Sequence, residues 1–171
     1  MGVGLRERGY TLIELAVVVF LVGLMLFLAV PKIKTALYTE NLKKANRMLI
    51  GTIRELKIAA LQEQVDQVLV LDLNNQVFWS YAVDMTPEKL AERKRQAIPL
   101  PSGVKIADVS QVGAEKEMEG EIAIRFYRQG NSQPTVVHLQ EGEQYETLVL
   151  SPFLATVKVH EGYVDISPIG I

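Results

Sequence analysis

Two different hydrophobic patterns follow one another along the chain, and the first is a nearly unbroken apolar run. Between Leu12 and Val30 the one charged side chain is Glu14. At about 1.5 Å per residue, a helix from Tyr10 to Val30 would measure roughly 31 Å, close to the thickness of a bilayer's hydrocarbon core. The run therefore predicts a membrane-spanning helix over residues 10–30. Because a carboxylate is costly in lipid, Glu14 is a candidate functional residue.

Beyond Pro31 the pattern becomes amphipathic. Apolar residues recur every three to five positions with charged residues between them, at Ile33, Leu37, Leu42, Ala45, Leu49, Ile53, Leu56 and Ala60. This spacing predicts a second helical half over residues 31–66, with one face turned toward a core. Since the period continues past Pro31, we expect that residue to kink the helix rather than end it. Two separate helices hinged at Pro31 are the alternative.

The remaining residues, 67–171, predict a β-rich head. Short apolar stretches separated by turn residues predict antiparallel strands at 68–73, 76–83, 104–109, 121–127, 135–140, 145–150, 155–160 and 163–166. The whole chain is therefore expected to be α+β, with a long N-terminal helix packed on an antiparallel sheet.

Two local signals refine the head. Asn74-Asn75 predicts a hairpin turn, because Asn tolerates the left-handed conformation, and Thr86-Pro87-Glu88 predicts a short surface helix ending near Gln96. Leu69, Leu71 and Leu73 alternate on one face of the predicted hairpin, with Val77, Trp79 and Tyr81 expected across from them. We therefore expect Trp79 to be a core ring rather than a platform for a ligand.

Composition removes several classes of function. The 171 residues include no cysteine, so the chain forms no disulfide bonds. The net charge of −2 gives no sign of the positively charged surface that binds nucleic acid. His138 and His160 each stand alone in a predicted strand, which argues against a zinc site. No nucleophile elbow or phosphate-binding glycine loop is present. We expect no enzymatic activity, no metal and no cofactor.

The N-terminal motif resembles a known signal. Residues 8–15 read Arg-Gly-Tyr-Thr-Leu-Ile-Glu-Leu, and they closely resemble the class III signal of type IV prepilins and type II secretion pseudopilins. The resemblance implies that residues 1–9 are a leader, cleaved after Gly9 by a prepilin peptidase that then methylates the new amine of Tyr10. Glu14 would accept the positive N-terminus of a neighbouring subunit, because opposite charges attract strongly in a low dielectric.

The same resemblance implies the placement of the chain. Arg6 and Arg8 before the apolar run nearly balance Lys32 and Lys34 after it, so charge alone does not set its orientation. By resemblance, the chain is a single-pass protein of the bacterial inner membrane, with a cytoplasmic N-terminus and a periplasmic head. A cleaved secretory signal, or a plain signal anchor whose glutamate reaches water, are the alternatives.

The C-terminal half resembles the GspH/FimT group of minor pilins and pseudopilins. The similarity lies in residues 122–130, which end in Phe-Tyr-Arg-Gln-Gly, and in residues 148–159, which contain Leu-Ser-Pro. Arg128 and Ala155 depart from the group, which commonly has Pro and Gly there. The lack of a cysteine and of an Asp- and Gly-rich calcium loop favours a minor pseudopilin over a major subunit.

This resemblance implies a structural subunit near the tip of a type II secretion pseudopilus. Its partners would be the major and other minor pseudopilins, the prepilin peptidase and methyltransferase, the inner-membrane assembly platform and the lipid bilayer. The alternative is a minor pilin of a type IV pilus, acting in assembly priming, adhesion or DNA uptake. From residue 141 onward the chain has five acidic residues and one lysine, a balance of −4, which disfavours DNA binding.

Overall fold

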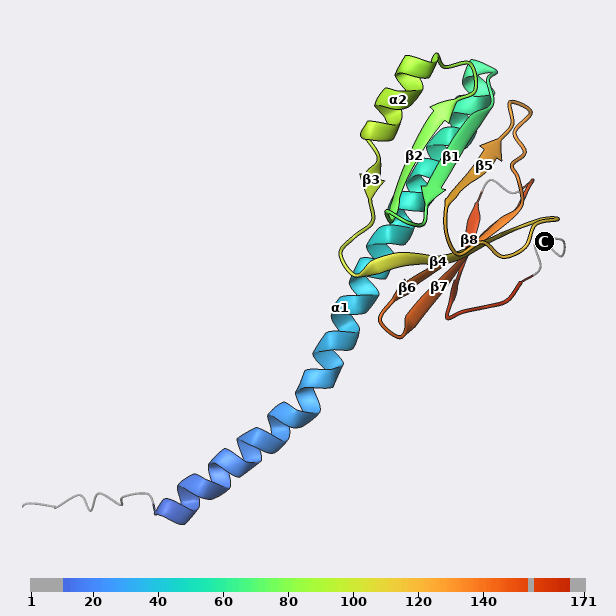
Figure 1. Ribbon diagram of the computed structural model, residues 1–171. Helices are drawn as coiled ribbons and strands as arrows, with labels where there is room; N and C mark the ends of the chain where they lie inside the picture. The colour runs from blue at the N-terminus through green and yellow to red at the C-terminus, as the bar shows by residue number, and fades with distance from the viewer. Residues whose placement is uncertain (1–10, 154–155, 167–171) are drawn as a thin grey trace, which may run out of the picture. The chain divides into compact units, whose positions relative to one another are not determined.

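The computed structural model describes residues 11–153 and 156–166, and the side chains of residues 27–39 are not described. The first element, α1 (Leu12–Glu63), is one helix of 52 residues (Figure 1). The chain forms two compact units, residues 1–37 and 38–171, and α1 contributes to both. Helical conformation continues through Pro31, which confirms that this residue does not end the helix. The kink itself stays a prediction.

In the described part of the chain, no helix combines the length and the hydropathy needed to cross a bilayer. The membrane span over residues 10–30 therefore remains a prediction.

The head contains two four-stranded antiparallel sheets. In the first sheet, β1 (Gln67–Asp72) lies between β5 (Glu121–Phe126) and β2 (Val77–Ala82), and β2 also pairs with the short β3 (Ile98–Pro99). The second sheet has the order β4 (Val104–Gln111), β6 (Thr135–Glu141), β7 (Gln144–Leu150), β8 (Val157–Glu161). A second helix, α2 (Pro87–Arg95), connects β2 to β3.

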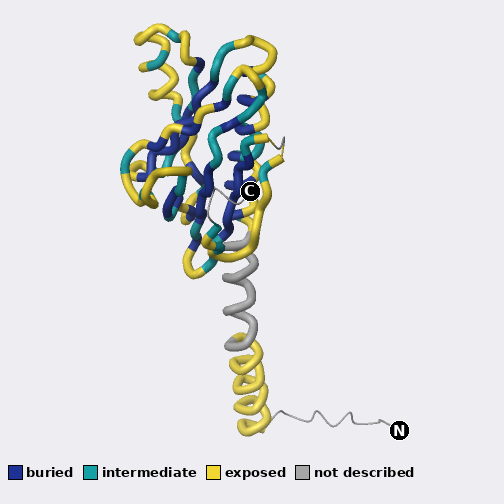
Figure 2. The backbone as a smooth tube through the Cα atoms, turned by 90° about the vertical axis from the view of Figure 1, so that its right-hand side faces the viewer, coloured by how far each residue is buried: buried dark blue, intermediate teal, exposed yellow. Residues whose placement is uncertain are grey.

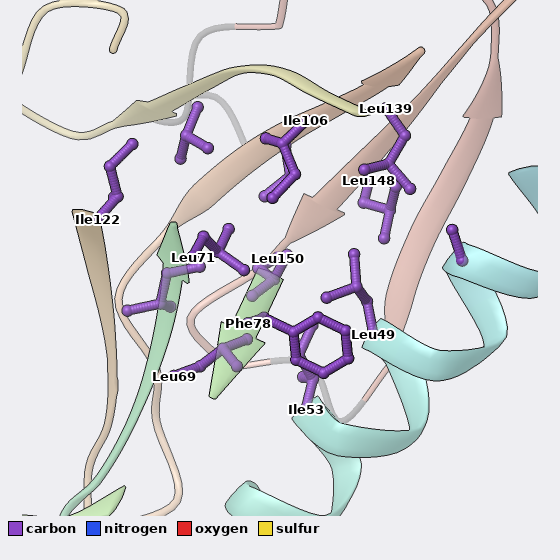
Figure 3. Packing of buried hydrophobic residues seen from close by; sticks show 14 of the residues in the cluster. Leu49, Ile53, Leu69, Leu71, Phe78, Ile106, Ile122, Leu139, Leu148 and Leu150 are labelled. Carbon is purple, nitrogen blue, oxygen red and sulfur yellow. The ribbon is translucent and has the colours of Figure 1, made fainter. Parts of the chain in front are cut away.

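The amphipathic stripe of α1 enters the core of the second unit. Its buried members are Leu42, Ala45, Leu49, Ile53, Leu56 and Ala60, as the spacing predicted. Figure 3 shows Leu49 and Ile53 pointing from the helix toward Phe78 and toward apolar side chains of both sheets. Burial of each such side chain contributes about 1.5–3 kcal/mol. Because one helix face contacts both sheets, α1 holds the two sheets in a single core.

The first sheet is buried on both faces. Leu69 and Leu71 face the main core, whereas Val68 and Val70 face a smaller cluster that contains Trp79 and, from α2, Leu90. The register pairs Val70 with Trp79 and Leu71 with Phe78. Trp79 is buried, as predicted, but its expected position opposite the Leu69 face is wrong. It lies under α2, which covers the face of the sheet that points away from the main core.

The turn between β1 and β2 is ordered by Asp72. Its carboxylate accepts hydrogen bonds from the backbone N–H groups of Asn74 and Asn75 at 3.0 and 2.9 Å, and from the side chain of Asn75. The side-chain bond is the largest cause that holds the pKa of Asp72 below its usual range, and the backbone bonds lower it further. The left-handed residue is Gln76, with φ of 56°, not the predicted asparagines. Its side-chain oxygen accepts a bond of 2.6 Å from the Ile106 N–H, which joins the hairpin to the second sheet.

One predicted strand is wrong. Residues 163–166 are described as irregular structure, because the backbone of Val164 bonds to side chains instead of a neighbouring strand. Its N–H donates to Thr147 Oγ1 at 3.0 Å, and its carbonyl oxygen lies 3.1 Å from His138 Nε2. The other predicted strands are present with shifted ends, and residue 155 of the last of these falls outside the described residues.

Candidate assembly site

The start of α1 is capped by Thr11. Its carbonyl oxygen accepts the first helical bonds from the N–H groups of Glu14 and Leu15, and its hydroxyl accepts a further bond of 3.3 Å from the Glu14 N–H. Thr-x-x-Glu is the sequence of a capping box, in which the two side chains can satisfy the free N–H groups of the first turn. The carboxylate of Glu14 lies in that first turn, where the positive end of the helix dipole favours a negative charge.

The Glu14 side chain is exposed, and no described residue forms an ion pair with it. Its carboxylate therefore has two oxygens available for a cation from another molecule. The site residues Gly9 and Tyr10 lie outside the described residues, as does the side chain of Pro31. Their predicted roles in cleavage, methylation and kinking stay predictions.

Apolar side chains surround the first described turns of α1 on every side. Each large apolar residue described between Leu12 and Leu26 is exposed, and Figure 2 shows this stretch as exposed along its length. A helix that is apolar all round is buried in a protein core or in lipid. Such an exposed apolar stretch is typical of a surface that contacts another molecule.

The head contains a buried aspartate–histidine pair that resembles part of a catalytic triad. His138 Nδ1 lies 2.6 Å from Asp108 Oδ1, and the two residues face each other across β4 and β6. A β-bulge between Ile106 and Asp108 inserts one residue into β4, and this brings Asp108 opposite the histidine. The sequence carried no signal for this pairing.

The geometry indicates that the Asp108–His138 pair has a structural role. His138 is only 1% exposed, and its second nitrogen faces the Val164 carbonyl oxygen at 3.1 Å. Tyr163 stacks on the ring with 4.0 Å between the ring centroids. Since each ring nitrogen faces a protein oxygen, none is left to act on a substrate. The pair instead fastens residues 162–165 across the second sheet.

Lys116, in the loop before β5, contacts the same segment that His138 contacts. It bonds to the Tyr163 hydroxyl and lies 3.8 Å from the carboxylate of Asp165. The bond to Tyr163 is the largest cause that raises the pKa of Lys116. Among the described residues, no group of three or more His, Asp or Glu side chains could hold a metal ion. The contacts of Lys116, Asp108 and His138 therefore hold residues 163–165 in place.

Comparison with known proteins gives information on the fold. No protein-family model matches the sequence, and no curated protein matches it. Among solved structures, the chain is similar to a crystal structure of the minor pseudopilin EpsH from the type II secretion system of Vibrio cholerae, with a TM-score of 0.52. The chain shares its fold with this pseudopilin. The aligned part covers 74% of this chain and 98% of the solved EpsH chain, at 13% identity.

A second EpsH structure gives the same result. Its TM-score is 0.53, and the alignment covers 73% of this chain and 99% of the solved EpsH chain, again at 13% identity. The predicted pilin-like combination of a helix and an antiparallel head is therefore confirmed for the described residues. Nearly the whole length of each solved EpsH chain has a counterpart in this chain, although few of the aligned residues are the same.

Two features described above were not predicted from the sequence: the cap at the start of α1 and the buried pair in the head. The Thr11-x-x-Glu14 cap is local, and its signature was present in the sequence. The Asp108–His138 pair depends on a bulge in one strand and on the register of another, which no local pattern reports.

Proposed function

We propose that this chain is a minor pseudopilin, a structural subunit near the tip of a type II secretion pseudopilus that supports protein export across the outer membrane. The proposal is carried by the fold, in which nearly all of each solved EpsH chain has a counterpart. The exposed apolar start of α1 supports it independently, because a filament built from packed helices needs such a surface.

In this proposal, residues 10–30 lie in the inner membrane, with the N-terminus in the cytoplasm and the head in the periplasm. The physical support is the set of apolar side chains exposed around the first turns of α1. Covering each one with lipid tails or with a neighbouring helix would gain about 1.5–3 kcal/mol. The lipid bilayer covers the helix before assembly, and neighbouring major and minor pseudopilins cover it afterward.

Processing prepares the helix for assembly. A prepilin peptidase and methyltransferase removes residues 1–9 after Gly9 and methylates the amine of Tyr10, before the inner-membrane platform adds the subunit to the filament. The carboxylate of Glu14 then pairs with the N-terminal amine of an adjacent subunit. The Thr11 cap is compatible with this role, since its hydroxyl bonds to the backbone N–H of Glu14 and not to its carboxylate.

Deletion of the chain tests the function directly. We expect the deletion strain to retain exported enzymes in its periplasm and to recover secretion when the full chain is restored. Normal secretion together with loss of surface pili and twitching would replace this proposal with a minor pilin of a type IV pilus. Loss of neither property would overturn both assignments.

Glu14→Leu tests the assembly role separately from processing. Mass spectrometry of the purified variant should still find an N-terminus at Tyr10, while its crosslinking to other pseudopilins and its rescue of secretion are lost. Glu55→Leu, which removes an exposed glutamate from the second unit's part of α1, is the matched control and should behave as wild type. A Glu14→Leu variant that assembles normally would refute the charge pairing.

The leader is tested by replacing Gly9 with a bulkier residue. The variant should accumulate with Met1 intact, because a peptidase that requires a small residue at the cut no longer accepts it. Mature protein starting at Tyr10 would count against the predicted cleavage site.

A further inference from the structure

An open pocket of about 470 Å³ lies where β7 begins and β8 ends, next to Leu42 of α1. Three of its lining residues are glutamates, Glu143, Glu146 and Glu161, and the described residues that line it include neither lysine nor arginine. Acidic residues alone are common on protein surfaces. The position of Glu146 is what distinguishes this pocket.

Glu146 occupies a position where the fold calls for an apolar residue. It is opposite Leu139 on β6 and precedes Leu148 by two residues on the same strand, so it shares the core-facing side of the sheet with both leucines. It is only 8% exposed, and its Oε2 atom is buried without a hydrogen-bond partner among the described residues. A buried carboxylate oxygen without a partner is costly.

The neighbouring strand increases this cost. The register places Glu161 of β8 directly opposite Glu146, and like charges in that relation destabilise a sheet. Burial, followed by the charge of Glu161, raises the pKa of Glu146, and the charge of Lys43 on α1 opposes this. Lys43 makes no ion pair with Glu146, so the free oxygen is not satisfied within the described chain.

A partner with positive charge and N–H donors would both satisfy this oxygen and offset the charge of the two glutamates. A metal ion does not fit, since no described group of His, Asp and Glu side chains could hold one. A guanidinium group does fit, because its planar fork of donors can bind two carboxylates at once and is weakly hydrated. Two opposed glutamates on adjacent strands present such a pair of acceptors.

We propose that the pocket between Glu146, Glu161 and Leu42 receives the guanidinium group of an arginine from an adjacent protein subunit. The identity of the carrier rests on the proposed function, in which this chain packs among other pseudopilins. The charge of the pocket supports this proposal, because two carboxylates face each other and no described cation forms an ion pair with Glu146. Binding would convert an unfavourable acidic pair into a three-member ion cluster.

The pocket is tested first with a defined probe on the full chain in detergent micelles. Nα-acetyl-arginine amide is titrated at constant ionic strength, while carbon-13 NMR follows the side-chain carboxyl signals of Glu146 and Glu161. We expect saturable shifts of both signals, with an affinity on the order of millimolar. Nα-acetyl-glutamine amide, which lacks the charge, should give none.

Variants separate the pocket from general charge effects. Glu146→Gln combined with Glu161→Gln should weaken probe binding by at least about tenfold. The control, Glu55→Gln combined with Glu115→Gln, removes the same charge from exposed positions and should bind as wild type. Absence of saturable shifts in the wild type, or equal weakening in both double variants, would overturn the proposal.

A second measurement tests the subunit as carrier. In cells, the Glu146→Gln and Glu161→Gln double variant should lose crosslinking to neighbouring subunits, which the control double variant keeps. If the chain is required for secretion but the titration shows no binding, the pocket inference fails alone. If the titration succeeds but deletion leaves secretion intact, the proposed function fails and the guanidinium site remains.

Discussion

The two parts of α1 place their apolar side chains in opposite environments. Leu21 in the first unit is 50% exposed, whereas Leu49 in the second unit is 2% exposed. The head supplies two sheets to cover the second part, and nothing described covers the first. One helix thus contains a segment that is buried by the head and a segment whose apolar side chains are exposed.

This difference follows from the arrangement of residues around the helix. Residues 40–63 are apolar on one face and polar on the other, so the sheets of the head cover the apolar face and leave the polar face exposed. Residues 12–26 are apolar all round, and only lipid or a bundle of helices surrounds such a segment. The second unit should therefore respond to mutation as a globular domain does, and the first as an assembly element.

The largest expected effect lies in the core of the second unit. Phe78→Ala should lower the free energy of unfolding by about 3–5 kcal/mol, since it removes a buried ring and leaves a cavity. Thermal unfolding of the full chain in micelles, followed by near-ultraviolet circular dichroism, measures this. Phe153→Ala is the control, since Phe153 is 86% exposed, and a comparable loss there would contradict the assigned core.

Charge substitution separates the two parts of α1 at positions of similar exposure. Leu21→Lys should impair membrane insertion by about 2.5–3.5 kcal/mol, the cost of a charge at mid-membrane. Ile58→Lys, at a position that is 46% exposed in the second unit, should have little effect. Extraction of membranes with alkaline carbonate measures both. Equal behaviour of the two variants would remove the distinction between the parts.

The Asp108–His138 pair predicts a loss of stability. Asp108→Ala should cost about 1–3 kcal/mol, because a buried ring nitrogen loses its acceptor. Residues 162–165 should become more sensitive to protease, since the ring that holds Val164 is no longer oriented. Denaturant unfolding and proteolysis measure these effects, with the exposed Asp84→Ala as control. Unchanged stability would show that the pair does not fasten this segment.

The helix starts offer a smaller contrast. Thr11→Val should destabilise the first turn of α1 by about 1 kcal/mol, because the hydroxyl accepts the Glu14 N–H bond. Thr86→Val should cost less at α2, where no side-chain cap bond forms. Amide hydrogen exchange in micelles compares the two helix starts. Equal protection changes would mean that the Thr11 bond contributes nothing.

The smallest expected effect concerns Glu146, whose buried Oε2 atom has no hydrogen-bond partner among the described residues. A carboxyl with a raised pKa favours folding only where it is protonated, so the wild type loses stability as the pH rises from a glutamate's usual range through the raised pKa. Glu146→Gln should therefore be more stable near neutral pH, by at most about 1 kcal/mol. Thermal unfolding across pH should show this gain disappear in acid; a gain that persists there would have another cause.

Much of the fold was predictable because its signals are local. The apolar run, the stripe through Leu49 and Ile53, the helix after Thr86 and most strands follow from periods of 3.6 or 2 and from turn residues. The motif around Gly9, Tyr10 and Glu14 is local as well. Its chemical roles stay predictions, because they belong to processing and assembly and not to the conformation of one chain.

The sequence by itself determined the two helices, most of the strands and which stretch of α1 is apolar on every side. Only the tertiary structure decided that Trp79 lies under α2, that a bulge sets Asp108 against His138, and that Glu146 is buried opposite Glu161. The physical reason is that the spacing of apolar residues along the sequence depends only on residues a few positions apart. Register, bulges and burial depend on residues far away in the chain, which meet only when the sheets pack on the helix.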